Sequence, residues 1–324
     1  MSHCHNITIK DIAKLAGVSK STVSRVINNE KGVSAAARQK IQKVIEECQF
    51  TPSISARGLK GHNKRVIAVI VTRLDSHSEN LALKSILSIC ETKNIDVLVL
   101  ESQFNNTVFN QHLSMLFSRQ IDGIIAFSFS ELTLEQAGYW KNRIVFISQR
   151  VTNFISIIYD NKGAVEKLYQ LYAAQFEHIA YIGIDDKDLS TGKERNQHYR
   201  DLCEQSHKPS YIYCANLSFT SGYEQAKQLF NQHQHIQAII CATDNIALGV
   251  CKFCHETGRE IKIGYIGCNV MLDFLFPNLD RVNLHVDLSG KLAIDQLLQL
   301  IKHPNDERYQ ESVLMQPCTL LPCK

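Results

Sequence analysis

Two periodic patterns of apolar residues follow one another along most of the chain. Short runs that are apolar at nearly every position, such as VIAVIVT from Val66 to Thr72, alternate with segments whose apolar residues recur at helical spacing. A continuous apolar run is typical of a strand buried on both faces of a parallel sheet. The alternation therefore predicts an α/β body of two doubly wound parallel-sheet lobes, with ligands at the carboxyl ends of the strands. We expect this body to span residues 64–324, with lobe 1 formed by about 64–160 plus 289–318 and lobe 2 by about 161–288.

The first 50 residues follow a different pattern, which predicts three short helices. The segment TIKDIAKLAG begins with Thr8 as a helix cap and ends at Gly17. VSKSTVSRVINN restarts a helix after Ser19, and SAAARQKIQKVIEECQ starts a third at Ser34. A short link between the first two helices makes a helix-turn-helix. Residues 1–50 are therefore expected to form a small all-α domain.

Charge separates this head from the body. Residues 1–61 carry ten lysines and arginines against four acidic residues, or +6, which leaves −3 of the net +3 for the rest of the chain. A basic head is suited to a polyanion. The second helix presents a polar face whose side chains can all donate hydrogen bonds. Lys20, Ser21 and Arg25 could reach base edges of double-stranded DNA, while Thr22, Ser24 and Asn28 suit phosphates. The alternative is a solvated polar helix face.

The segment TIKDIAKLAGVSKSTVSRVINNEKGVS, from Thr8 to Ser34, resembles the N-terminal signature of the lactose-repressor family of bacterial transcription regulators. This resemblance implies a cytoplasmic homodimer that binds a DNA operator and is not an enzyme. FTPSISARGLKG is similar to the family's hinge segment, here residues 51–63. In the family a hinge leucine wedges into the minor groove, which implies that role for Leu59 and close packing for Ala56. Gly58 should cost the hinge helix about 1 kcal/mol relative to alanine.

Polar residues at the predicted strand ends form a candidate effector site in the body. Guanidinium groups pair with phosphate, while acids and carboxamides suit sugar hydroxyls. Several of these residues could equally be helix caps or surface residues. The candidates are Arg73, Glu79, Ser128, Gln149, Arg150, Arg195, Thr243, Asp244 and Asn269.

Five body segments narrow the resemblance within the family. VTRLDSHSENLA, ESQF, IDGI, STGKER and CATDNIALG are similar to members whose effector is trehalose 6-phosphate. The resemblance implies effector contacts for Arg73, Glu79, Arg195 and Thr243, control of trehalose uptake and catabolism genes, and trehalose itself as a further candidate effector. An arginine expected after the fourth strand aligns with Gln149, and Arg150 follows it. A glycine expected near Ser128 is also replaced.

Other functional classes have little support in the sequence. There is no apolar run of about 20 residues for a membrane span and no apolar signal core. No G-x-G-x-x-G, P-loop or G-x-S-x-G segment occurs, so neither catalysis nor a cofactor is expected. The haem-like string CKFCH lies in a predicted helix, and no other spacing suits a metal. A repressor for another sugar or sugar phosphate, and a ligand-dependent co-repressor, stay open. The PCTLLPCK end has no heptads, which favours a dimer over a coiled-coil tetramer.

Overall fold

The chain divides into two compact units, Met1–Lys64 and Arg65–Lys324, called here the head and the body. The computed structural model describes residues 8–27, 30, 32–48, 64–130, 132, 134, 137–304 and 312–323. Asn28, the hinge segment 51–63 and its residues Ala56, Gly58 and Leu59 lie outside the described residues.

The head contains the three predicted helices, and polar caps set their ends. Gly17 follows the first helix with a φ of 61°, a left-handed conformation that glycine adopts without steric cost. Ser19 Oγ accepts a hydrogen bond from Thr22 N at 3.2 Å, and Ser34 Oγ accepts one from Ala37 N at 3.3 Å. The helices are α1 Ile9–Ala16, α2 Lys20–Ile27 and α3 Ala35–Glu47. Their buried apolar side chains form one small core: Ile12, Ala13, Ala16, Val23, Val26 and Ile41.

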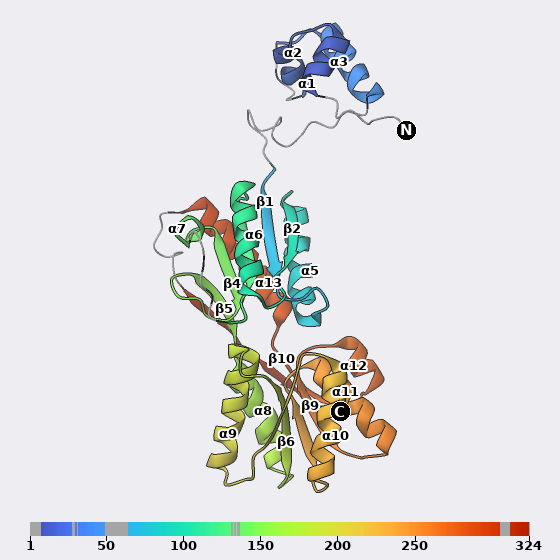
Figure 1. Ribbon diagram of the computed structural model, residues 1–324, viewed down its shortest axis with the longest axis vertical. Helices are drawn as coiled ribbons and strands as arrows, with labels where there is room; N and C mark the ends of the chain where they lie inside the picture. The colour runs from blue at the N-terminus through green and yellow to red at the C-terminus, as the bar shows by residue number, and fades with distance from the viewer. Residues whose placement is uncertain are drawn as a thin grey trace. The chain divides into compact units, whose positions relative to one another are not determined.

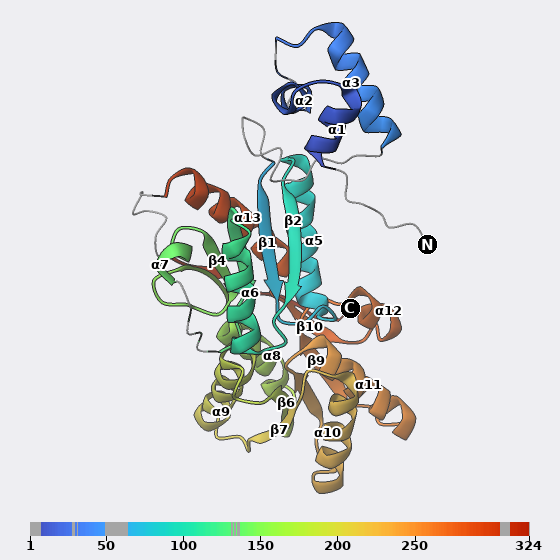
Figure 2. The same ribbon diagram turned by 45° about the horizontal axis from the view of Figure 1, so that its top comes forward.

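Lobe 1 of the body is built on a six-stranded parallel sheet with the order β11-β5-β4-β3-β1-β2. Its strands are β1 Val66–Val71, β2 Asp96–Glu101, β3 Gly123–Phe127, β4 Ile144–Ser148, β5 Ile155–Tyr159 and β11 Val313–Gln316. Its helices are α5 His77–Thr92, α6 Asn106–Ser118, α7 Ala137–Trp140 and α13 Val286–Lys302. Figures 1 and 2 show α6 on one face of this sheet and α13 on the other.

The unbroken apolar run of β1 is explained by burial on both faces. Ile67 and Val69 belong to the core that includes α5 and α13, whereas Ala68 and Ile70 belong to the core that includes Phe109 of α6. A half-exposed strand would need alternating polar residues. The strand therefore ends where the first polar residue, Thr72, appears.

Lobe 2 repeats the arrangement with the strand order β12-β10-β9-β8-β6-β7, in which the β10–β12 pair alone is antiparallel. Its strands are β6 Ile179–Ile184, β7 Tyr211–Ala215, β8 Ala238–Cys241, β9 Lys262–Ile266, β10 Asp280–Asn283 and β12 Thr319–Leu321. Its helical segments are α8 Asn161–Ala173, the π-helical turn η1 Leu189–Glu194, α9 Arg195–Gln205, α10 Phe219–Gln232, α11 Asp244–Thr257 and α12 Val270–Leu275. Figure 1 shows α8 and α9 on one side of this sheet and α10 and α11 on the other.

Three chain segments pass between the lobes: β5 to α8, β10 to α13, and β11 to β12. The segment between β11 and β12 is hydrogen-bonded to the segment between β5 and α8, because Cys318 Sγ donates to Asp160 Oδ2 at 3.4 Å. Strands of both sheets therefore end at this junction, where a ligand can meet both lobes. Among the described residues, no helix has the length and apolarity that a bilayer crossing requires.

Candidate functional site

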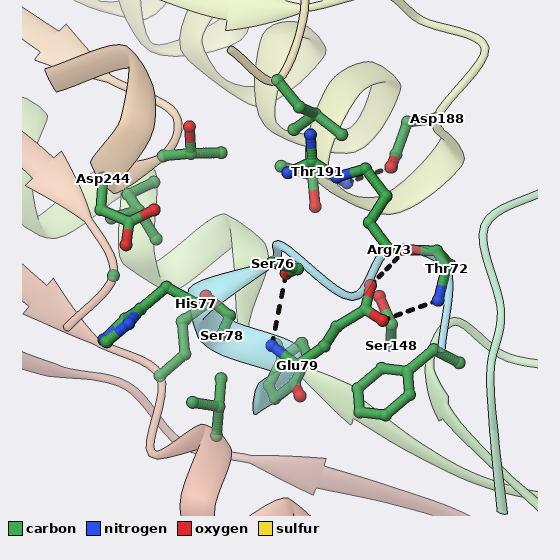
Figure 3. A pocket seen from close by; sticks show the side chains of 18 of the residues that line it. Thr72, Arg73, Ser76, His77, Ser78, Glu79, Ser148, Asp188, Thr191 and Asp244 are labelled. Carbon is green, nitrogen blue, oxygen red and sulfur yellow. Dashed lines mark hydrogen bonds between the residues drawn. The ribbon is translucent and has the colours of Figure 1, made fainter. Parts of the chain in front are cut away.

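A cavity lies between the two lobes, at the carboxyl ends of their strands. It encloses about 970 Å³ when space open to solvent is counted. Lobe 1 contributes Arg73 and Glu79, and lobe 2 contributes Arg195 and Asp244. Figure 3 shows Arg73 and Glu79 close together, with Asp188 among the groups facing them from lobe 2.

Glu79 is held by the residue that ends β1. Its Oε2 accepts a hydrogen bond from Thr72 N at 2.7 Å, and its Oε1 accepts one from the Thr72 hydroxyl. Burial raises the pKa of Glu79 to about 7, although the hydrogen bonds from Thr72 and the charge of Arg73 act in the opposite direction. The carboxyl group therefore changes charge near neutral pH, at the wall of the cavity.

Arg73 stands at the mouth of β1 among acidic groups. Its Nε lies 3.4 Å from Asp75 Oδ1, yet among the described residues this buried nitrogen has no hydrogen-bond partner. Glu101 Oε1 accepts a hydrogen bond from Leu74 N at 2.7 Å, and that bond, with a smaller contribution from Arg73, lowers the pKa of Glu101. The loop after β1 is thus anchored, and Arg73 keeps donor capacity for a ligand.

Arg195 is fixed more tightly, at the start of α9. It is only 3% exposed, its Nε donates to Asn161 Oδ1 at 2.8 Å, and its Nη1 donates to Ala242 O at 2.5 Å. Asn161 Nδ2 in turn donates to Glu194 Oε2 at 3.0 Å. Burial lowers the pKa of Arg195, but an arginine keeps its charge at physiological pH. It is therefore a preorganised cation of lobe 2.

The segment STGKER, which ends at Arg195, contains the turn that positions this arginine. The π-helical turn η1 leads directly into α9, so that Arg195 is the first residue of that α-helix. Asp188 Oδ1 accepts hydrogen bonds from the backbone nitrogens of Ser190 at 3.1 Å and Thr191 at 2.7 Å. The hydroxyl groups of Ser190 and Ser148 are 3.3 Å apart and join the two lobes across the cavity.

Three predicted site residues lie at the N-termini of helices α11 and α12, at or beside the cavity. They are Thr243, Asp244 and Asn269. Thr243 Oγ1 accepts from Ile246 N at 3.3 Å and caps α11. Asp244 lines the cavity, and its Oδ2 accepts from Asn269 Nδ2 at 3.0 Å. Asn269 does not line the cavity; it caps α12 and holds Asp244 in place.

The structure changes the expectation for the end of β4. Ser128 lines the cavity. Its hydroxyl group accepts a hydrogen bond from Gln149 N and donates one to Gln149 O, each at 3.0 Å. Gln149 and Arg150 do not line the cavity, and Arg150 is exposed. Ser148, with a φ of 89°, is the residue of this strand end that faces the cavity. The cavity thus has two arginines among its described lining residues, where the sequence predicts three.

Several lining residues were not predicted from the sequence: His77, Ser148, Asp188, Phe104 and Phe129. Phe104 and Phe129 pack edge to face, with ring centroids 5.6 Å apart. Phe104 lies in ESQF, one of the segments that carry the resemblance to members of the family. His77 and Asp188 sit next to predicted site residues, and that proximity is the one signal that could have identified them.

The predicted DNA-binding face lies on α2. Lys20, Ser21 and Arg25 are exposed, while Thr22 and Ser24 are half-buried. The buried residues of α2, Val23 and Val26, belong to the head's core instead. One side of the helix is therefore basic and polar, and the other holds it to the domain.

Comparisons with known proteins agree with both units. Residues 8–53 match the family model described as bacterial regulatory proteins, lacI family, and residues 168–322 match a periplasmic binding protein-like domain. The chain is 37% identical over 306 residues to the HTH-type transcriptional regulator TreR of Salmonella typhimurium, covering 94% of this chain and 96% of that protein.

Solved structures give the same picture. The trehalose repressor from Escherichia coli superposes with a TM-score of 0.75 at 31% identity, covering 80% of this chain and all of that chain. The Lac repressor dimer bound to operator and the anti-inducer ONPF has a TM-score of 0.78 at 22% identity, covering 98% of both chains.

Proposed function

Because the chain belongs to the lacI family of bacterial regulatory proteins, we propose that it represses genes of trehalose uptake and catabolism and that trehalose 6-phosphate is its inducer. Its relatives are transcriptional regulators, and the chain is a transcriptional repressor of this type and not an enzyme. The trehalose assignment draws on the relatives named TreR and trehalose repressor. Operator and effector would both be met in the cytoplasm.

One observation carries the effector proposal: cationic side chains from both lobes converge on one cavity. Arg73 comes from lobe 1 and Arg195 from lobe 2, and both line the cavity with Glu79 and Asp244. Guanidinium groups suit a phosphate, and carboxylates suit the hydroxyl groups of a sugar. A phosphorylated disaccharide matches this mixture of charges.

Coupling to DNA follows from the position of the cavity. A ligand that touches both lobes stabilises the lobe arrangement in which its contacts are best, and it can shift the protein only by that difference in affinity. On the DNA side, Lys20, Ser21 and Arg25 of α2 would reach base edges, with Thr22, Ser24 and Asn28 toward phosphates. We propose that the inducer shifts the body toward the lobe arrangement that binds it best. In this arrangement the paired heads would bind the operator more weakly.

We also propose that the protein acts as a homodimer, with α12 in the contact between copies. Val270, Met271 and Phe274 of this helix are 74%, 69% and 84% exposed, and a cluster of exposed large apolar side chains is typical of an interaction surface. Phe274→Asp should raise the concentration needed for dimers in analytical ultracentrifugation. Phe219→Asp, at an exposed phenylalanine of α10, should not. Equal behaviour of the two variants would exclude α12.

The decisive test is an operator gel shift titrated with trehalose 6-phosphate, trehalose and glucose 6-phosphate. Trehalose 6-phosphate should release the operator at the lowest concentration. Operator binding that is unaffected by all three sugars would refute the effector assignment. Binding that requires the ligand would instead identify a co-repressor.

A second candidate is a repressor of the same family that answers another sugar or sugar phosphate. The observation in its favour is the end of β4, where Gln149 and Arg150 do not line the cavity. The described lining residues include two arginines and not the three that the sequence predicts. A phosphorylated sugar therefore has a smaller advantage in affinity over a neutral sugar. Trehalose equal to or better than trehalose 6-phosphate in the same titration would support this candidate.

A further inference from the structure

His77 is a lining residue of the cavity, and one nitrogen of its ring has no hydrogen-bond partner among the described residues. It is the first residue of α5, next to the loop that carries Arg73. Its Nε2 is buried, and among the described residues no hydrogen-bond partner reaches it. Buried polar atoms in folded proteins are nearly always hydrogen-bonded, and an exception needs an explanation.

The neighbouring acidic groups of the cavity already have partners. Glu79 is bonded to Thr72, and Asp188 accepts from the backbone of η1. Asp244, which is drawn toward the left of Figure 3 as His77 is, accepts from Asn269 Nδ2 and from Asn245 N at 3.0 Å each. These carboxylates are bonded to Thr72, to Asn269 or to the backbone, whereas the buried Nε2 of His77, a residue that lines the same cavity, has no such partner among the described residues. The other charged groups that line this space are Arg73 and Arg195.

We propose that His77 binds the effector directly, with its Nε2–H donating a hydrogen bond to a sugar hydroxyl or phosphate oxygen. This inference rests on the proposed function, because it assigns a partner within the same cavity. It also gives the cavity an imidazole donor beside its two arginines. His77 would thus help to set affinity and to choose between a neutral and a phosphorylated sugar.

Calorimetry on the full chain tests this with three variants. His77→Leu removes the donor and keeps an apolar volume, whereas His77→Gln offers an amide nitrogen in place of Nε2. His255→Leu makes the same change at an exposed histidine of α11 that does not line the cavity. The ligands are trehalose 6-phosphate and trehalose.

His77→Leu should weaken binding of trehalose 6-phosphate by about fivefold to tenfold, the usual effect of losing one hydrogen bond. His77→Gln should recover most of that loss, and His255→Leu should match the wild type. A loss confined to trehalose 6-phosphate identifies a phosphate oxygen as the acceptor, and an equal loss for trehalose identifies a hydroxyl. Wild-type affinity for both sugars in His77→Leu overturns the inference.

The two proposals can fail separately. Wild-type protein that binds neither sugar refutes the proposed function, and the role of His77 falls with it. Wild-type protein that binds while His77→Leu binds equally well refutes the role of His77 alone. If the leucine variant does not fold, nitrogen NMR of the wild-type histidine side chains decides. Saturation with trehalose 6-phosphate should then shift the Nε2 resonance assigned to His77, and an unmoved resonance overturns the inference.

Discussion

Replacing Glu79 by glutamine should stabilise the folded body at alkaline pH while weakening sugar binding. The carboxylate of Glu79 is largely withdrawn from water, which raises its pKa from an ordinary 4.5 to about 7. A group whose folded-state pKa is raised binds its proton more tightly in the folded chain than in the unfolded chain. Wild-type stability should therefore be greatest below about pH 4.5 with respect to this group, and should fall as pH rises through 7.

The size of this effect follows from the pKa difference. Raising a carboxyl pKa from 4.5 to about 7 corresponds to roughly 3 kcal/mol of unfolding free energy, at about 1.4 kcal/mol per pH unit. Glutamine has no proton to lose in this range and so avoids that cost. It cannot, however, accept both hydrogen bonds from Thr72 in the way that a carboxylate does. We therefore expect a net gain of about 1–2 kcal/mol above pH 7.

Urea denaturation of wild type and Glu79→Gln at pH 5 and pH 8 measures this difference. The free energy of unfolding of the variant, relative to that of the wild type, should be higher at pH 8 than at pH 5. The reason is that the buried charge of Glu79 exists mainly at pH 8. Isothermal titration at pH 8 should show weaker binding of trehalose 6-phosphate, since an amide is a poorer acceptor for sugar hydroxyls than a carboxylate. A variant that is less stable at pH 8 than at pH 5, relative to wild type, would refute the assignment of a destabilising buried charge.

Three further predictions concern the cations. Arg73→Ala should cost roughly 1.5–3 kcal/mol of effector binding, as for a charge-assisted hydrogen bond, and normal calorimetric affinity would remove Arg73 from the site. Arg25→Ala should weaken operator binding in a gel shift while leaving effector affinity unchanged, and equal loss of both would contradict separate sites. Operator affinity should fall by about 0.9 log unit per neutralised phosphate for each log unit of salt, and a flat response would argue against the basic face of α2.

Secondary structure in the body and its division into two parallel-sheet lobes could be predicted largely from the apolar pattern. The continuous runs of β1 and its neighbours require burial on both faces, and the structure supplies a helix on each side of Ile67 and Ala68. Local chemistry fixed the helix ends in the same way, as Gly17 and Ser34 show. The π-helical turn before Arg195 was not predicted, because its geometry depends on the bonds to Asp188.

Which polar residues meet in the cavity was partly predictable. Parallel strands end at one edge of each sheet, so Arg73 and Arg195 could be expected at the facing edges of the two lobes. At the end of β4 the residue that lines the cavity is Ser148, one or two positions before Gln149 and Arg150. There the orientation depends on the positive φ of Ser148 and on the bonds from Ser128 to the backbone of Gln149. Apolar periodicity carries no information about either.

The contact between Ser148 and Ser190 bears on how a ligand could control the body. Two hydroxyl groups 3.3 Å apart form a weak hydrogen bond, worth about 1 kcal/mol at most. A sugar phosphate that engages Arg73 and Glu79 on one lobe and Arg195 on the other would make several bonds at once. Its bonds would outweigh this serine contact, provided that they form best in one arrangement of the lobes. Control by the effector thus requires cavity residues from both lobes, and a ligand held by one lobe alone would bind without regulating.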